Sequence, residues 1–291
     1  MANNIALFKK YIALLDEVYQ NAAVTSILDS DASLAQQGAN ANEIVIPKIS
    51  MDGLADYSRN GGYVSGNVTL TNETVQFNYD RGRKFTVDAM DNEETAGIAF
   101  GKLASEFIRT KVAPEMDAFR FATYAGLSGI SKVDTGATLA AGADVISALR
   151  AATTTMDEDE VPMEGRLLFI TPTLKGLVED LDTTKSREVL GRFAQLVLVP
   201  QTRFYTAIDL LDGTTSGEEA GGFKKSDSGK DINFMVIHKP ALLQYTKHTV
   251  NKIITPDDNQ FSDGWMFHYR AYGLADAYDN KLSGIYLHHK A

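Results

Sequence analysis

The sequence predicts an α+β protein of elongated shape, and three features carry this prediction. Apolar residues recur at three-to-four spacing over residues 92–124, which predicts a helix of about 50 Å at ~1.5 Å per residue. Residues 43–88 alternate apolar and polar side chains around glycine-rich turns, which predicts a long β-hairpin. The chain after residue 232 consists mainly of β-rich runs and predicts a sheet.

The remaining elements follow in order along the chain. An apolar stripe over residues 3–28 predicts an amphipathic helix within the N-terminal segment 1–42. Pro114 stands inside the helical pattern of 92–124, so we expect that helix to kink or to restart with Pro114 in its first turn. Glycines after residue 125 end the helix and place a boundary between residues 126 and 142.

Residues 138–231 predict a mixed α/β block. Its expected elements are a helix near 143–154, a strand at 166–171, a helix opening at Pro172 and a strand at 195–199. Between residues 212 and 231 the chain is rich in Gly, Ser and Thr and has no apolar face. We expect this loop to be mobile unless a partner orders it.

Composition excludes several classes of protein. The 291 residues carry a net charge of −10, which argues against a general binder of nucleic acid or anionic membranes, because such proteins need a cationic face. The chain has no cysteine, which excludes disulfides, thiolate metal sites and cysteine nucleophiles. No window approaches ~18 consecutive apolar residues, and the N-terminus lacks the apolar core of a signal peptide, so we expect a soluble cytoplasmic product.

No motif predicts catalysis. The five histidines form no H-E-x-x-H pattern, and neither a phosphate loop nor a G-x-S-x-G elbow occurs. We therefore expect no enzyme activity and no catalytic, cofactor-binding or metal-ligating residues. The alternative is a metal-dependent enzyme that uses the acidic group Asp88, Asp91, Glu93 and Glu94, although acidic residues at a helix start are also favoured by the helix dipole.

The predicted hairpin needs a surface to lie on. A two-stranded ribbon with little core-facing area is marginal in water, and the length of this one favours contact with a neighbouring subunit. Polar and aromatic side chains along it are the candidate contacts between subunits. They are Asp56, Tyr57, Arg59, Tyr63, Arg81 and Arg83.

Several short motifs follow one another in a particular order along the chain. They include Ile46-Pro47-Lys48-Ile49-Ser50, Gly53-Leu54-Ala55-Asp56-Tyr57, Asp80-Arg81-Gly82-Arg83, Ala113-Pro114-Glu115-Met116-Asp117, Asp263-Gly264-Trp265 and Asp279-Asn280-Lys281. With these motifs the sequence resembles the major capsid proteins of tailed bacteriophages and prophages, whose fold is shared with encapsulins and herpesvirus capsid floors. The likeness spans residues 43–125 and 232–289.

The resemblance implies a fold and its domains. The expected parts are an N-terminal arm (1–42), an extended β-hairpin loop that overlaps the adjacent subunit (43–88), a peripheral domain with spine helix 92–124 and a sheet (89–137 and 232–291), and an axial α/β domain (138–231).

The resemblance also implies a function. Pentamers and hexamers of such a protein would assemble into an icosahedral shell around double-stranded DNA, without sequence-specific contacts, a cofactor or a membrane. A separate scaffolding protein, a portal and a possible decoration protein are the implied partners, and the virion capsid, assembled in the host cytoplasm, is the implied location. The alternative within the same fold is an encapsulin, a compartment shell that packages a cargo enzyme.

Overall fold

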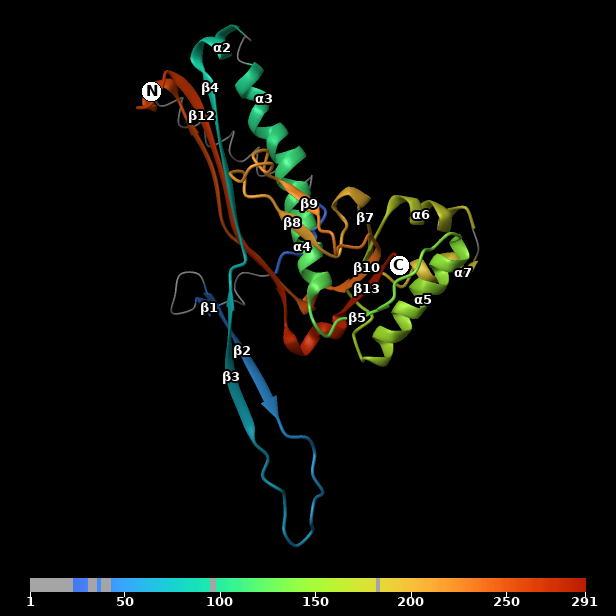
Figure 1. Cartoon of the computed structure of the whole chain (residues 1–291). Helices are drawn as coiled ribbons and strands as arrows, with labels where there is room; N and C mark the ends of the chain where they lie inside the picture. The colour runs from blue at the N-terminus through green and yellow to red at the C-terminus, as the bar shows by residue number, and fades with distance from the viewer. Residues whose placement is uncertain (1–22, 31–35, 38–42, 95–97, 182–183) are drawn as a thin grey trace.

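The computed structural model describes residues 23–30, 36–37, 43–94, 98–181 and 184–291. The molecule is elongated and has three parts (Figure 1). A body carries the helices α5 to α7, an arm of long strands extends from it in one direction, and a two-stranded ribbon projects in the other.

The body is built on a five-stranded sheet of order β5-β13-β10-β6-β7. Strand β10 pairs antiparallel with β13 and β6, whereas the outer pairs, β13 with β5 and β6 with β7, are parallel. Helices α5 to α7 cover one face, where Leu149 packs with Leu168 and Phe234, and α4 covers the other, where Phe121 packs with Phe169. The bounds are β5 Ser131–Lys132, β6 Arg166–Ile170, β7 Gln195–Leu198, β10 Ile232–His238, β13 Ile285–His289, α5 Gly142–Glu158, α6 Pro172–Glu179 and α7 Thr184–Leu190.

The arm is a three-stranded antiparallel sheet of order β11-β12-β4, with β4 Tyr79–Asp88, β11 Leu242–Ile254 and β12 Gly264–Ala277. Helical segments run along one of its faces, where Phe107 contacts the rings of Phe85, Phe267 and Tyr269. These segments are α3 Ile98–Phe107, the π-helical turn η3 Ile108–Val112 and α4 Ala113–Gly126, with α2 Ala89–Glu94 at the end of the arm.

The ribbon consists of β2 Glu43–Met51 and β3 Val68–Gln76, with the short β1 Gln36–Gln37 beside β2. At its base Ile44 and Ile46 are buried against Leu243 and Leu274 of the arm strands. The base is thus anchored in the core, and the rest projects beyond the body (Figure 1). Short elements complete the chain: η1 Ser26–Leu28, η4 Gln201–Arg203, β8 Ile208–Leu210, β9 Phe223–Lys225, η5 Lys239–Ala241, η6 Pro256–Asp258 and η7 Asp279–Gly284.

The predicted hairpin of residues 43–88 is too long. Residues Tyr79–Asp88 do not continue the ribbon but pair with β12 over ten positions. The chain changes sheets at Asn78, whose side chain donates to the carbonyl of Ala275 and accepts from the amide of the same residue. Alternate side chains of β4, such as Phe85, gain more burial under α3 than a free ribbon offers, which explains the difference.

The sequence predicts that the strands after residue 232 complete the sheet beside the long helix. In the structure only some of them do so. The strands β10 and β13 lie in the body sheet with β6, and only β11 and β12 join the arm. Six of the seven residues of β10 are buried, which is the pattern of a strand covered on both faces. Residue 232 therefore does not divide one sheet from another, and the division into axial and peripheral domains stays a prediction.

The long helix restarts near Pro114, as predicted. The π-helical turn η3 precedes α4, and Pro114 stands in the first turn of α4. The amphipathic N-terminal helix falls mostly outside the described residues, and Ser26–Leu28 within it is a 3-10 turn. Among the described helices, none is long and apolar enough to cross a membrane.

Candidate assembly site

The outer half of the ribbon carries an apolar patch. The register places Ile49 opposite Leu70 and Met51 opposite Val68, so the four side chains lie on one face, because directly opposed residues share a face. All four are 59–72% exposed. The apolar residues at alternate positions 49, 51, 68 and 70 were the signal for this patch in the sequence, and our set of candidate contacts missed it.

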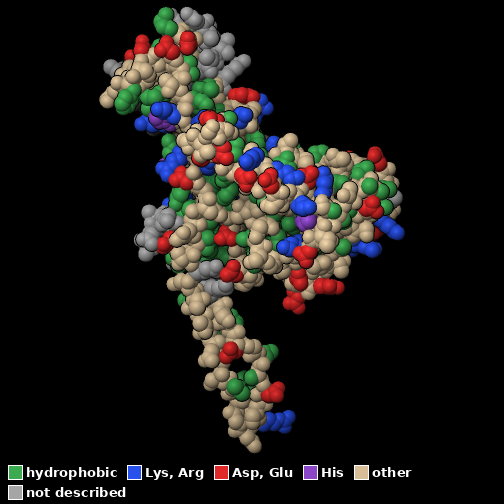
Figure 2. Space-filling view, viewed as in Figure 1, with side chains coloured by type: hydrophobic (Ala, Val, Ile, Leu, Met, Phe, Trp, Pro, Cys, Tyr) green, Lys and Arg blue, Asp and Glu red, His purple; other side chains and the backbone are tan. Residues whose placement is uncertain are grey.

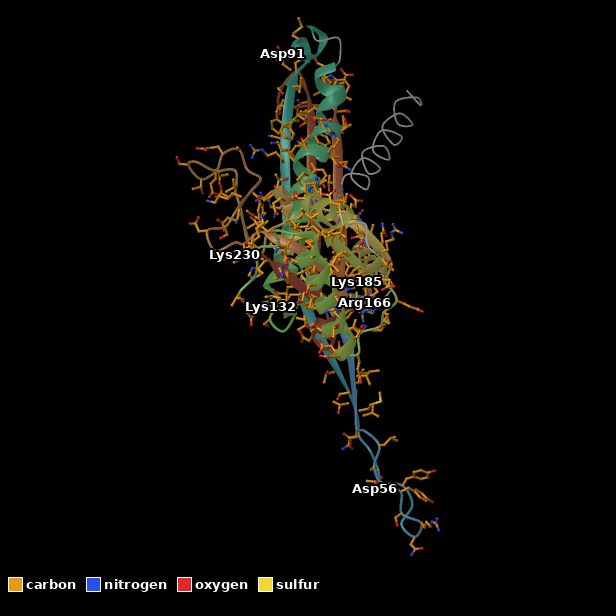
Figure 3. The ribbon with its side chains drawn as sticks, turned by 90° about the vertical axis from the view of Figure 1, so that its right-hand side faces the viewer. Asp56, Asp91, Lys132, Arg166, Lys185 and Lys230 are labelled. Carbon is orange, nitrogen blue, oxygen red and sulfur yellow. The ribbon has the colours of Figure 1, made fainter. Side chains whose placement is uncertain are left out.

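The ribbon ends in a tip, residues 52–67, which is held together by its own hydrogen bonds. Asp52 Oδ2 accepts the amide of Asn67 at 2.8 Å, and Ser58 and Gly62 bridge each other through their backbones. Gly62 has φ of +76°, a conformation that favours glycine. The tip thus has a defined turn geometry, and it lies far from the body (Figure 3).

Four of the candidate contact residues lie in this tip. The rings of Tyr57 and Tyr63 pack at 4.9 Å between centroids, and both are exposed, as are Asp56 and Arg59. Eight of the thirteen large hydrophobic side chains that are exposed in the described chain belong to the ribbon and its tip. They are Ile49, Met51, Leu54, Tyr57, Tyr63, Val64, Val68 and Leu70. Such a concentration of exposed apolar groups is typical of an interaction surface.

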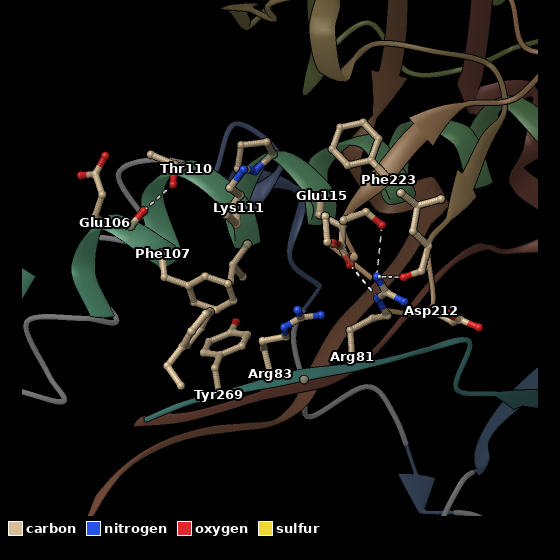
Figure 4. A pocket seen from close by; sticks show the side chains of 18 of the residues that line it. Arg81, Arg83, Glu106, Phe107, Thr110, Lys111, Glu115, Asp212, Phe223 and Tyr269 are labelled. Carbon is tan, nitrogen blue, oxygen red and sulfur yellow. Dashed lines mark hydrogen bonds and ion pairs between the residues drawn. The ribbon is translucent and has the colours of Figure 1, made fainter. Parts of the chain in front are cut away.

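The other two candidates, Arg81 and Arg83, do not lie on the ribbon but on β4, and their contacts are within the chain (Figure 4). Arg81 Nε donates to Glu115 at 2.8 Å, and its Nη2 donates to the carbonyls of Leu211 and Gly222. Arg83 donates to the carbonyl of Glu219. These bonds account for both arginines without a neighbouring subunit, and any further role between subunits stays a prediction.

The two arginines line a cleft of about 880 Å³. Its walls are β4, the α3–α4 helical segments and the loop 211–222, and Phe107, Phe223 and Tyr269 supply its aromatic lining. The loop is the first part of the glycine-rich segment 212–231 that we expected to need a partner for order, and Phe223–Lys225 of the same segment form the strand β9. The partner that the structure shows is β4 of the same chain, through Arg81 and Arg83.

The loop also has an internal turn. Asp212 accepts hydrogen bonds from the amides of Thr214 and Thr215 and from the hydroxyl of Thr215. These bonds stabilise the carboxylate and hold the pKa of Asp212 well below its usual range. The turn is therefore a structural feature rather than an acid–base group.

A buried polar clamp fixes residues 23–30 to the body. The Asp117 carboxylate, fully buried in α4, accepts from the amides of Val24 and Thr25, from the Thr25 hydroxyl, and from Arg203 at 2.9 Å. Gln244 of β11 donates to the carbonyl of Thr25. The clamp holds residues 23–30 against α4 and β11, and the sequence analysis did not identify it.

The alternative of a metal site used Asp88, Asp91, Glu93 and Glu94. Among the described side chains, which do not include those of Glu93 and Glu94, no three His, Asp or Glu residues form a group that could hold an ion. Asp88 instead accepts the backbone amide of Met90 at the start of α2, a capping role.

No family model and no curated protein matches the sequence. Solved structures do match. The capsid structure of cyanophage P-SCSP1u aligns with a TM-score of 0.57 at 14% identity, over 87% of this chain and 84% of the other. The mature capsid of bacteriophage PhiM1 aligns at 0.58 and 11% identity, over 89% and 84%. A virus-like particle from Pyrococcus furiosus aligns at 0.55 and 8% identity, over 96% and 99%. The chain therefore has the fold of tailed-phage capsid proteins, as the sequence resemblance predicted.

Proposed function

We propose that the protein is the structural subunit of an icosahedral viral shell that encloses double-stranded DNA. The observation that carries the proposal is the ribbon, which together with its tip exposes eight large hydrophobic side chains and projects away from the body. A subunit that works alone gains nothing from such a projection, whereas a subunit in a lattice can cover it with its neighbours. The fold shared with phage capsids supports the same conclusion.

In this proposal the subunits form pentamers and hexamers. The contacts are made by the tip residues Asp56, Tyr57, Arg59 and Tyr63 together with the apolar patch. A scaffolding protein, a portal and a possible decoration protein are separate chains, the shell assembles in the host cytoplasm, and the finished location is the virion. The role is structural and needs no catalytic residue or cofactor.

The test is light scattering on a size-exclusion column with electron microscopy of the peak. The chain is expressed alone and with each neighbouring gene. We expect closed shells, or free pentamers and hexamers that close when one neighbour is added, which identifies the scaffold. A stable monomer under every condition contradicts the proposal.

A second candidate is an encapsulin-type shell that packages a cargo enzyme. The observation in its favour is the virus-like particle from Pyrococcus furiosus, which matches over nearly the full length of both chains. Purified particles distinguish the two functions by their contents. Double-stranded DNA inside the particle supports the viral shell, and a co-purifying enzyme without DNA supports the compartment.

A further inference from the structure

The cleft between the arm and the loop 211–222 has no role in the proposed shell function. Its volume of about 880 Å³ falls within the range of ~300–1,000 Å³ that is usual for small-molecule sites. One wall is β4, a second is the helical run α3, η3 and α4, and a third is the loop (Figure 4). In the space-filling view the cleft lies on a molecule whose surface mixes acidic and basic groups (Figure 2), so its own lining decides what it can bind.

Aromatic side chains line the cleft. The ring of Phe107 lies edge-on to that of Tyr269, with centroids 5.9 Å apart, and 4.7 Å from that of Phe85. Phe223 of β9 lines the cleft as well. Phe85, Phe107 and Phe223 are each half-buried. Rings that stay partly exposed in a concave site favour an apolar or aromatic ligand group, because contact with it removes more of their area from water.

Two cations of the lining keep unused hydrogen-bond donors. Arg83 donates from Nη2 to the carbonyl of Glu219, and its Nε and Nη1 have no hydrogen-bond partner among the described residues. Lys111 forms no hydrogen bond or ion pair with any residue that the structure describes. Figure 4 shows the Arg83 guanidinium pointing from β4 toward the helical run. Cations with free donors in a concave site favour an anionic ligand group.

The acidic side chains of the lining already have donors. Glu106 accepts from the guanidinium of Arg109, and Glu115 accepts from that of Arg81. Asp212 accepts from the amides of its own turn. These three carboxylates leave the two free cations to a ligand, yet their charges oppose a ligand with more than one negative charge. A monoanion therefore fits the cleft better than a phosphate dianion.

Two glycines bring the backbone of the loop close to Arg83 without covering it. A Cβ at Gly213 would lie 2.7 Å from Arg83 Nη1, and a Cβ at Gly221 would lie 3.1 Å from the same atom. Both glycines have positive φ, +77° and +64°, a conformation that favours glycine. Any side chain at either position would occupy the space beside Nη1, so the glycines keep this donor open to a ligand.

We propose that the cleft binds a ligand with an aromatic ring and a single carboxylate. The free donors of Arg83 supply charge-assisted hydrogen bonds to the carboxylate, and Phe107 and Phe223 supply the apolar contact. This chemistry comes either from a small aromatic acid or from the C-terminal residue of a peptide. The inference uses only contacts within one chain and does not depend on the shell function.

The first test measures binding to the full chain by ligand-observed NMR titration. The probes are 3-phenylpropionate and its uncharged amide. We expect saturable binding of the acid and about tenfold weaker binding of the amide. Arg83→Gln should weaken binding of the acid about tenfold, and Arg83→Lys, which keeps the charge, should weaken it less. The matched control, Arg150→Gln, makes the same substitution at an exposed arginine of α5 and should bind like the wild type.

Protection of the loop is a second measurement, and it reports where the ligand sits. The loop forms one wall of the cleft, so bound 3-phenylpropionate should slow cleavage after Glu218 or Glu219 by a glutamate-specific protease, whereas the amide should not. This experiment uses the wild-type chain, so it tests the proposal even if Arg83→Gln does not fold.

An acetylated tripeptide that ends in phenylalanine distinguishes the two sources of the ligand. Tighter binding of the tripeptide than of 3-phenylpropionate supports a chain end, and equal or weaker binding supports a small acid. Equal binding of acid and amide, unchanged binding by a folded Arg83→Gln, or no protection of the loop refutes the proposal. Absence of saturable binding of either acid refutes it, and so does tighter binding of adenosine monophosphate, because the cleft then prefers a phosphate dianion.

Discussion

Replacing Asp117 with Asn tests the buried clamp on residues 23–30. The carboxylate is fully buried and accepts four hydrogen bonds at 2.6–3.1 Å, one of them from the Arg203 guanidinium. The amide keeps the size of the side chain but removes its charge and one acceptor oxygen. Loss of one partner from a buried, hydrogen-bonded ion pair costs ~3–5 kcal/mol, so we expect the free energy of unfolding to fall by about that much.

The assay is urea unfolding of the unassembled subunit, followed by circular dichroism, for the wild type and two variants. The control is Asp80→Asn, the same substitution in an exposed pair, where Asp80 lies 2.6 Å from Arg270 with both side chains about half-exposed. Exposed pairs contribute ~0–1 kcal/mol, so the control loses little. If the free energy of unfolding falls no more in Asp117→Asn than in Asp80→Asn, the clamp does not stabilise the fold and the reasoning is wrong.

Three further predictions concern other parts of the chain. Burial lowers the pKa of His288 to about 4, whereas an exposed histidine titrates near 6.5, so the unfolded chain takes up the proton first as the pH falls. The free energy of unfolding should therefore drop by about 3 kcal/mol between pH 6.5 and 4, and His288→Gln should flatten this dependence in urea titrations. Arg81→Gln should release the loop 211–222 and raise its rate of cleavage by a glutamate-specific protease after Glu218 or Glu219, whereas Arg109→Gln, whose partner Glu106 is exposed, should not. Gly136→Ala should lower the melting temperature, because Gly136 has φ of +65° and an added Cβ would lie 2.5 Å from the ring of His289 and from the Lys290 carbonyl.

Local patterns in the sequence predicted most elements but not which sheet each strand joins. The strand at 166–170, the helix opening at Pro172 and the restart at Pro114 follow from nearby residues, and the structure confirms them. The alternation in 79–88 fits a free hairpin and an arm strand equally well. Only the pairing with residues 264–273 of β12, far along the chain, decides between them. Sheet membership is a long-range property, and the alternation of a single strand does not encode its neighbour.

The same limit applies to charged residues. The run Asp80-Arg81-Gly82-Arg83 is typical of an exposed turn, and we therefore predicted that both arginines contact a neighbouring subunit. In the structure Arg81 joins Glu115 to the carbonyl of Leu211, in a loop 130 residues further along the chain. Arginine has donors for several acceptors at once, so its role depends on groups that only the fold brings together. Lys84 and Lys252 are a second example. They are 168 positions apart in the sequence, and the fold brings them to one face of the arm sheet because each lies opposite His268 of β12.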